Sequence, residues 1–176
     1  MQELTDKNFG LLIAYVLPGF GAFHALSAVS PIASQWLARP PAEPSLIGFL
    51  CGMLASLGLG LFVSATRWLT IDPLLHRTGV TPPRWDFAQL ATKLEAFDAL
   101  VMSHYRYYQF YANLLVVMPL WGMLQLRNSA ITSSATNWFA LVVVETVLLL
   151  AARDTLRKYY RRAETVLNER SSILRA

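Results

Sequence analysis

Cysteine is almost absent from this chain. The single cysteine, Cys51, lies inside a long apolar segment. One cysteine cannot form an intramolecular disulfide, and it cannot build a cysteine-based metal cluster. We expect Cys51 to be a small apolar packing residue, which is the usual role of a buried thiol.

Charged residues are also scarce. They make up 15% of the 176 residues, whereas an ordinary soluble domain has about 25%. Hydrophobic residues make up 55%, and the mean hydropathy is +0.39. This composition predicts an integral membrane protein. The net charge of +4 suits arginines and lysines beside anionic lipid, and we expect no nucleic-acid partner.

Motifs that carry chemistry are missing as well. The sequence has no glycine-rich phosphate loop, no nucleophile elbow and no zinc-binding helix motif. We therefore predict no catalytic residue, no metal ion and no cofactor. Several acids and histidines are scattered along the sequence, and nothing in it indicates that they form one metal site: Asp72, His76, Glu95, Asp98 and His104.

Four segments are long and apolar enough to cross a bilayer, whose hydrocarbon core of about 30 Å takes roughly 20 residues of helix. They are residues 9–30, 46–69, 109–126 and 135–152. The third is short and contains Asn113 and Pro119. A secretory signal is the alternative for the first, but Glu3 and Asp6 precede it in place of a basic region, so we predict a retained helix.

The arginines and lysines predict the orientation. Four crossings place thirteen of the fifteen basic residues on one side of the membrane, with both termini and the long middle loop. Basic residues gather on the cytoplasmic side. We predict a multi-pass bacterial inner-membrane protein with cytoplasmic N- and C-termini. Three crossings would separate the two most basic segments, which favours the weak third crossing.

The cytoplasmic segments are predicted to be helical. Asp72 and Pro73 suit the start of a short helix, and Asp86 suits the cap of a longer one that continues from residue 87 to 126. After the fourth crossing, a C-terminal helix over 153–174 has apolar residues spaced by four and three, with only Arg170 out of the pattern: Leu156, Tyr160, Ala163, Leu167 and Leu174.

These helices should form a stalk. Because the third crossing enters the membrane and the fourth leaves it, their extensions within residues 70–108 and 153–176 should pair antiparallel. The predicted fold is all-α: a single domain over 1–176, with a four-helix membrane bundle and a helical cytoplasmic stalk.

A stripe of small residues follows one face of the second apolar segment. Small residues let helices approach closely in lipid, so the stripe predicts either packing within the bundle or a homo-oligomer interface. Its members are Gly48, Gly52, Ser56, Gly60 and Ser64.

Glu145 stands alone in the apolar stretch LVVVETVLLL. At the same predicted depth, Pro18, Gly19 and Gly21 suggest a break in the first helix, with His24 farther out. An ionised carboxylate in lipid costs several kcal/mol unless it is paired or wet. Two hypotheses remain: a neutral, hydrogen-bonded glutamate, or an ion or proton site formed with the helix break.

The stretch SHYRYYQFY, residues 103–111, should lie where a helix enters the membrane. Tyrosine with arginine is typical of the interfacial belt, and stacking on a lipid headgroup or a nucleotide is the alternative. The residues proposed for this contact are His104, Tyr105, Arg106, Tyr108 and Tyr111.

Three functional hypotheses follow. The first is a homo-oligomeric channel or membrane-perturbing effector with a polar path past Glu145, gated by the stalk. The second is a membrane anchor or sensor whose stalk recruits a soluble partner, as in bacterial antiviral defence or signalling modules. The third is a lipid-modifying enzyme that uses His76 and His104, for which the sequence offers least.

Overall fold

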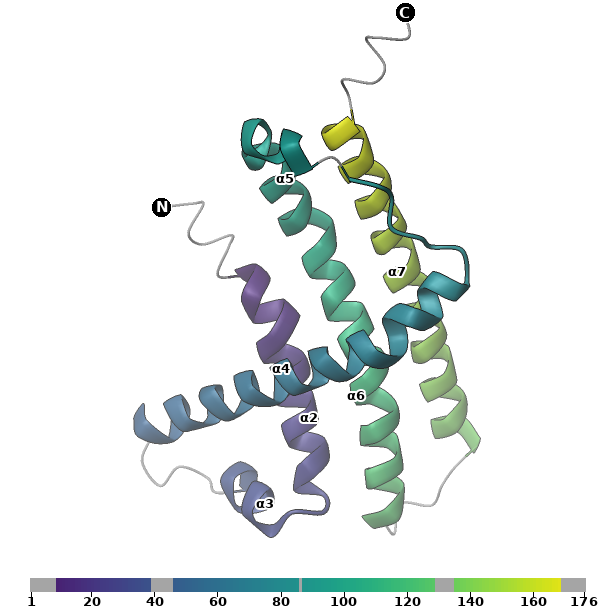
Figure 1. Ribbon diagram of the computed structural model, residues 1–176. Helices are drawn as coiled ribbons and strands as arrows, with labels where there is room; N and C mark the ends of the chain where they lie inside the picture. Colours follow the sequence, from purple (N-terminus) through teal and green to yellow (C-terminus); the bar gives the residue numbers. More distant parts are fainter. Residues whose placement is uncertain (1–8, 39–45, 86, 129–134, 169–176) are drawn as a thin grey trace, which may run out of the picture.

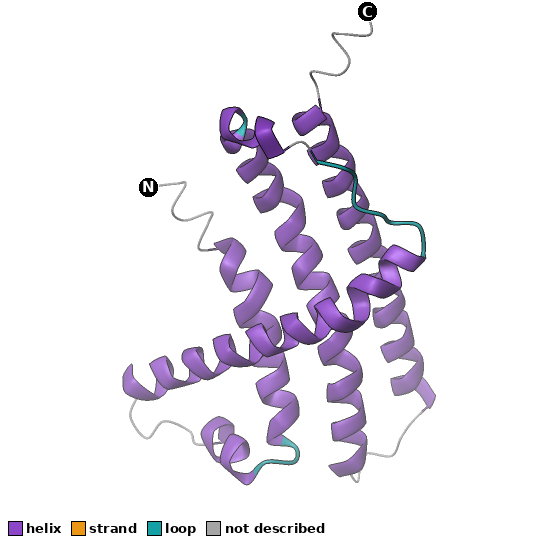
Figure 2. Ribbon diagram, in the orientation of Figure 1, coloured by secondary structure: helices purple, strands orange, loops and turns teal. Residues whose placement is uncertain are grey.

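The computed structural model describes residues 9–38, 46–85, 87–128 and 135–168 (Figure 1). All regular secondary structure in these ranges is helical, as predicted, and no strand occurs in them (Figure 2). The elements are η1 (Leu12–Val16), α2 (Leu17–Ser27), α3 (Pro31–Ala38), α4 (Leu46–Arg77), η2 (Phe87–Thr92), α5 (Leu94–Leu100), η3 (Val101–Tyr105), α6 (Arg106–Asn128) and α7 (Ala135–Asn168). Elements η1 and η3 are π-helical turns, and η2 is a 3₁₀-helix.

Three helical segments are long and apolar enough to cross a membrane. They are Phe9–Ser27, Gly48–Arg77 and Ala135–Asn168. The predicted third crossing falls in α6, which is not among them because polar residues interrupt its apolar sequence. Two of these, Gln109 and Asn113, are buried against the neighbouring helices.

Helices α2, α6 and α7 lie in one layer, and α4 runs obliquely across it (Figure 1). Helix α4 meets α2 where Gly60 lies against the Tyr15 carbonyl just before α2 begins. It then meets α6, where Val63 packs in one cluster with Val117. Its last turn reaches α7. The arrangement differs from an ordinary four-helix bundle, in which all helices run nearly parallel.

Helix α4 continues without a break to Arg77, with Pro73 inside it. The prediction that Asp72 caps a new helix was therefore wrong, because the Asp72 carboxylate bonds other side chains. The helix ends where the sequence places a turn. Gly79 has a φ of 89°, which suits glycine, and the Val80 N–H bonds the Leu75 carbonyl at 3.3 Å.

The predicted continuous helix over 87–126 is interrupted. The 3₁₀-helix η2 ends at Thr92, Lys93 has the non-helical angles φ −124° and ψ 21°, and α5 begins at Leu94. From there α5, η3 and α6 follow one another directly. Asp86, the predicted cap, lies outside the described residues.

The antiparallel pairing of the two extensions is present in the structure. Phe97 and Tyr105 pack on a cluster that includes Leu156, Tyr159 and Ala163 of α7. The buried seam of α7 uses Tyr159 where the sequence suggested Tyr160, which is half-buried. Leu174, the last predicted seam residue, lies outside the described residues.

The small-residue stripe of α4 divides into two parts. Ser56 and Gly60 are buried at the crossing with the first helix, and a Cβ added at Gly19 would overlap the Ser56 carbonyl oxygen. Gly48 is exposed, and a Cβ at Gly52 would meet nothing within 4 Å. Ser64 is half-buried. The stripe therefore packs within the chain over only part of its length.

We expect Gly19→Ala and Gly60→Ala to destabilise the fold. The new Cβ would overlap the backbone of α4 in the first variant and the Tyr15 carbonyl in the second. Overpacking of this kind typically costs about 1–3 kcal/mol. Thermal unfolding in detergent would measure the loss.

Gly52→Ala and Gly58→Ala are the matched controls. A Cβ at either position has open space, and alanine is a better helix former than glycine by about 1 kcal/mol. Both variants should unfold at or above the wild-type temperature. Equal destabilisation in all four variants would contradict the close crossing.

Candidate functional site

The first helix is not broken at its proline. The π-turn η1 leads directly into α2, so the predicted break across Pro18–Gly21 was wrong. Pro18 lacks the N–H that would bond the Ala14 carbonyl in a regular α-helix. Asn113 of α6 supplies a donor instead. Its Nδ2 lies 2.8 Å from the Ala14 carbonyl oxygen, and the residue is 0% exposed.

Two more polar side chains of α6 face η1. Gln109 donates from Nε2 to the Tyr15 hydroxyl at 3.1 Å, and Arg106 donates from Nη1 to Gln109 Oε1 at 3.1 Å. The Arg106 guanidinium also lies 5.8 Å from the centre of the Tyr15 ring. Arg106, Gln109 and Asn113 are spaced by three and four residues and share one helix face. The polar face of α6 therefore points into the protein.

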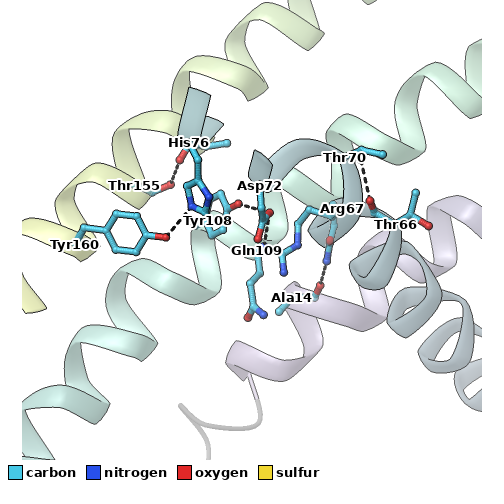
Figure 3. Close-up of polar contacts among 12 residues, drawn as sticks. Ala14, Thr66, Arg67, Thr70, Asp72, His76, Tyr108, Gln109, Thr155 and Tyr160 are labelled. Carbon is cyan, nitrogen blue, oxygen red and sulfur yellow. Dashed lines mark hydrogen bonds and ion pairs between the residues drawn. The ribbon is translucent and has the colours of Figure 1, made fainter. Parts of the chain in front are cut away.

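An ion pair within α4 is tied to α6 by Tyr108 (Figure 3). Arg67 is 4% exposed, and its Nη1 lies 3.2 Å from Asp72 Oδ1. The Tyr108 hydroxyl donates to the same carboxylate oxygen at 2.5 Å. The guanidinium lies 5.2 Å from the centre of the Tyr108 ring, within cation–π distance. The buried cation is therefore held by a carboxylate and by an aromatic face.

The last turn of α4 is also tied to α7. His76 Nε2 and the Tyr160 hydroxyl are hydrogen-bonded at 3.2 Å (Figure 3). Two turns earlier on α7, Arg153 donates from Nη2 to the Thr78 carbonyl at 3.1 Å. These bonds connect the end of α4 to the part of α7 that follows its apolar stretch.

We call this set of side chains the polar cluster. It contains Tyr15, Arg67, Asp72, His76, Arg106, Tyr108, Gln109, Asn113 and Tyr160. Within the described part of the chain, three of its buried atoms have no hydrogen-bond partner: Arg67 Nε, Arg106 Nε and Asn113 Oδ1. With two arginines and one carboxylate, the cluster has an excess of positive charge.

An apolar cluster adjoins the polar one between the same helices. Ala22, Val63 and Val117 are buried there, with Leu59 and Val116 packed against them. On α4 and α6, these residues lie one to two turns from the polar cluster, toward α3. The polar contacts are therefore confined to one level of the fold.

Glu145 lies apart from the first helix. Leu141, one turn before it on α7, packs against Gly122 of α6. Glu145 is half-buried, and its Oε1 is buried with no hydrogen-bond partner among the described residues. Because α6 lies between α2 and α7 (Figure 1), the structure does not join Glu145 to Pro18.

His24 and the small residues near it have structural contacts. His24 Nδ1 accepts a hydrogen bond from Trp121 Nε1 at 3.1 Å. Gly19 lies in the close crossing with α4, and a Cβ at Gly21 would come within 3.1 Å of Val117. These residues position α2 against α4 and α6.

The tyrosine-rich stretch mostly faces the protein. Tyr108 is 1% exposed, so the prediction that it contacts a lipid headgroup was wrong. The Tyr105 ring centre lies 5.0 Å from that of Tyr159. His104 and Tyr111 are half-buried. The exposed tyrosine of the stretch is Tyr107.

The acids and histidines considered for a metal are not brought together. No group of three or more metal-ligating side chains occurs in the described ranges. Asp72 and His76 bond separate partners, Tyr108 and Tyr160. The structure therefore gives no support to metal binding by these residues.

The sequence interpretation missed Arg67, Gln109 and Asn113. Arg67 had a signal, because it interrupts the apolar run LFVSATRWLTIDPLL just as Glu145 interrupts the fourth. Asn113 was read as a weakness of the third crossing, when its amide completes the backbone bonding of the first helix.

Comparison of the chain with protein-family models, curated proteins and solved structures gives no match. The roles of the polar cluster therefore follow from its geometry.

We expect Asp72→Ala to destabilise the protein strongly. It would leave the buried Arg67 guanidinium without its carboxylate, and removing one partner of a buried pair typically costs about 3–5 kcal/mol. Tyr108→Phe removes one hydrogen bond and should cost about 1–2 kcal/mol. Asp154→Ala is the control, since Asp154 pairs with Lys158 on the surface. Thermal unfolding in which Asp72→Ala matched Asp154→Ala would contradict the role of the ion pair.

Proposed function

We propose that this chain is a membrane anchor or sensor whose helical stalk recruits a soluble partner. The stalk consists of α5, η3 and the part of α7 from Arg153 to Asn168. The observation that carries the proposal is the polar cluster, which connects α4, embedded by its apolar surface, to the start of α6 and to the α7 side of the stalk. The chain would serve as a subunit of a bacterial signalling or defence module.

The proposed topology has four crossings and cytoplasmic termini. Helix α6 serves as the third crossing, because its polar residues Gln109 and Asn113 point inward and exposed apolar side chains such as Leu120 and Met123 remain for lipid. This topology places thirteen of the fifteen basic residues on the side of the stalk. The corresponding location is a bacterial inner membrane.

Contact between α4 and the stalk offers a route for a signal. Asp72 bonds Tyr108 at the start of α6, and His76 bonds Tyr160 in the stalk. A rotation or shift of α4 in the membrane would strain these bonds, since Tyr108 and Tyr160 both sit on packed helices. Helix α4 is therefore the element through which a change in the bilayer would reach the stalk.

A pore through one copy of the chain has little support. Apart from Ser56, the buried polar residues in the described ranges gather at one level, and the apolar cluster of Ala22, Val63 and Val117 fills the adjoining space. Water would have to pass this apolar cluster. The geometry therefore favours recruitment over conduction by a single chain.

The outer face of the stalk is the proposed surface for the partner. It carries four exposed charged residues of α7: Arg157, Arg161, Arg162 and Glu164. Their excess of arginine suits an acidic protein surface. Homo-oligomerisation of the anchor would present several such surfaces together.

Photo-crosslinking would test recruitment. A photoreactive amino acid in place of Arg162 should give an adduct with a soluble protein in cells. In place of Met123, which is 66% exposed on α6, it should react with lipid. His76→Leu, which leaves the outer face unchanged, should weaken the Arg162 adduct by altering the stalk. Adducts of Arg162 with lipid or with further copies of the chain alone would refute recruitment.

A homo-oligomeric channel is the second candidate, and Glu145 favours it. Its buried Oε1 lacks a partner within the described residues, while Val142 and Val144 beside it are exposed for contact with another copy. We expect wild-type protein in liposomes to pass protons or cations if this function holds. Glu145→Gln should abolish the flux and leave thermal stability in detergent nearly unchanged. Full wild-type flux in Glu145→Gln would exclude the glutamate as an ion site.

A further inference from the structure

The apolar surfaces of α4 and α7 end at the same level of the fold. The last large apolar side chain that is exposed is Leu74 on α4 and Leu150 on α7. The hydrogen bond from Arg153 Nη2 to the Thr78 carbonyl brings the two ends together at 3.1 Å. The change from apolar to charged surface therefore occurs side by side on two helices, although the sequence separates them by some 75 residues.

Three arginines surround this junction. Arg77 precedes Thr78 in the chain, Arg153 holds the Thr78 carbonyl, and Arg157 lies one turn beyond Arg153 on the same face of α7. All three side chains are exposed. Their positions in the chain place three positive charges at this end of the apolar surface.

Nearby carboxylates have other partners. Asp72 of α4 is paired with Arg67 and bonded by Tyr108, and Asp154 of α7 lies 2.6 Å from Lys158 Nζ. The charge of the three arginines is therefore not neutralised by the described acids closest to them in sequence. A ligand with a negative charge fits this group.

Exposed leucines adjoin the arginines on the membrane side. Leu74 lies one turn before Thr78 on α4, and Leu149 lies one turn before Arg153 on α7. Leu150 beside it is 60% exposed. The site thus combines a cationic end and an apolar flank, in the order in which a phospholipid has its phosphate and its acyl chains.

We propose that Arg77, Arg153 and Arg157 bind the headgroup phosphate of an anionic phospholipid whose acyl chains lie along Leu74 and Leu149. Arginine suits phosphate because its guanidinium donates hydrogen bonds in a planar fork. The bound lipid would bridge α4 and α7 beside the Arg153–Thr78 bond. This site shares Arg157 with the partner surface proposed on the stalk, whereas Arg161, Arg162 and Glu164 belong to the partner surface alone.

Native mass spectrometry after reconstitution would test the site. Wild-type protein taken from nanodiscs of equal parts phosphatidylglycerol and phosphatidylcholine should retain phosphatidylglycerol. Arg77→Gln with Arg157→Gln should lower the retained phosphatidylglycerol by about fivefold for each arginine lost, the factor expected of one basic residue near an anionic surface. Arg161→Gln with Arg162→Gln removes the same charge farther along α7 and should retain the lipid. Equal loss of phosphatidylglycerol in both double variants would show that retention depends only on net charge, and it would overturn the proposal.

Two further measurements complete the test. Arg153→Lys should keep lipid retention close to wild type and Arg153→Gln should lower it, with circular dichroism showing that both variants remain folded. Glycerol phosphate added to detergent-purified protein should stabilise it much less than phosphatidylglycerol does. Equal stabilisation by the two would assign the arginines to a soluble phosphate and overturn the lipid site.

Discussion

The fold depends on keeping one positive charge inside an apolar helix. Arg67 lies in α4 with hydrophobic residues on both sides, and an unpaired charge there would cost several kcal/mol. Asp72 supplies the counter-charge, and Tyr108 supplies both a hydrogen bond and an aromatic face. This requirement determines where α4 crosses α6, because the Arg67 guanidinium must lie over the Tyr108 ring.

Backbone contacts set the remaining geometry. The absence of side chains at Gly19 and Gly60 lets α4 lie directly on the first helix. Because Pro18 has no N–H, the Ala14 carbonyl lacks its usual backbone donor, and Asn113 of α6 donates to it instead. Two features that usually weaken helices thus become points of attachment, and the polar side chains of α6 have partners without facing lipid.

The sequence predicted the helices well and their mutual rotation poorly. Hydropathy identifies apolar segments, and the order of crossings leads to the pairing of α5 and η3 with α7 that the structure contains. Gly52 and Gly60 look equivalent in a stripe with a period of four, and only the oblique path of α4 distinguishes them. Counting residues along the apolar segments likewise predicted that Glu145 and Pro18 lie at the same depth in the membrane. The count could not show that α6 separates them. A local capping rule predicted that Asp72 begins a helix. Asp72 instead lies inside α4 and accepts a hydrogen bond from Tyr108.

The two π-turns, η1 and η3, set how two distant parts of the chain are rotated toward each other. A π-turn holds one residue more than regular α-helix, and each residue turns the helix by about 100°. The turn η1 therefore rotates Phe9 and Gly10 relative to α2, and η3 rotates α5 relative to α6. The segment before η1 meets η3, since a Cβ on Gly10 would lie 2.8 Å from Met102 Cε. A single-residue deletion in one turn would turn one partner away from the other, so insertions and deletions at these two places should be inherited together.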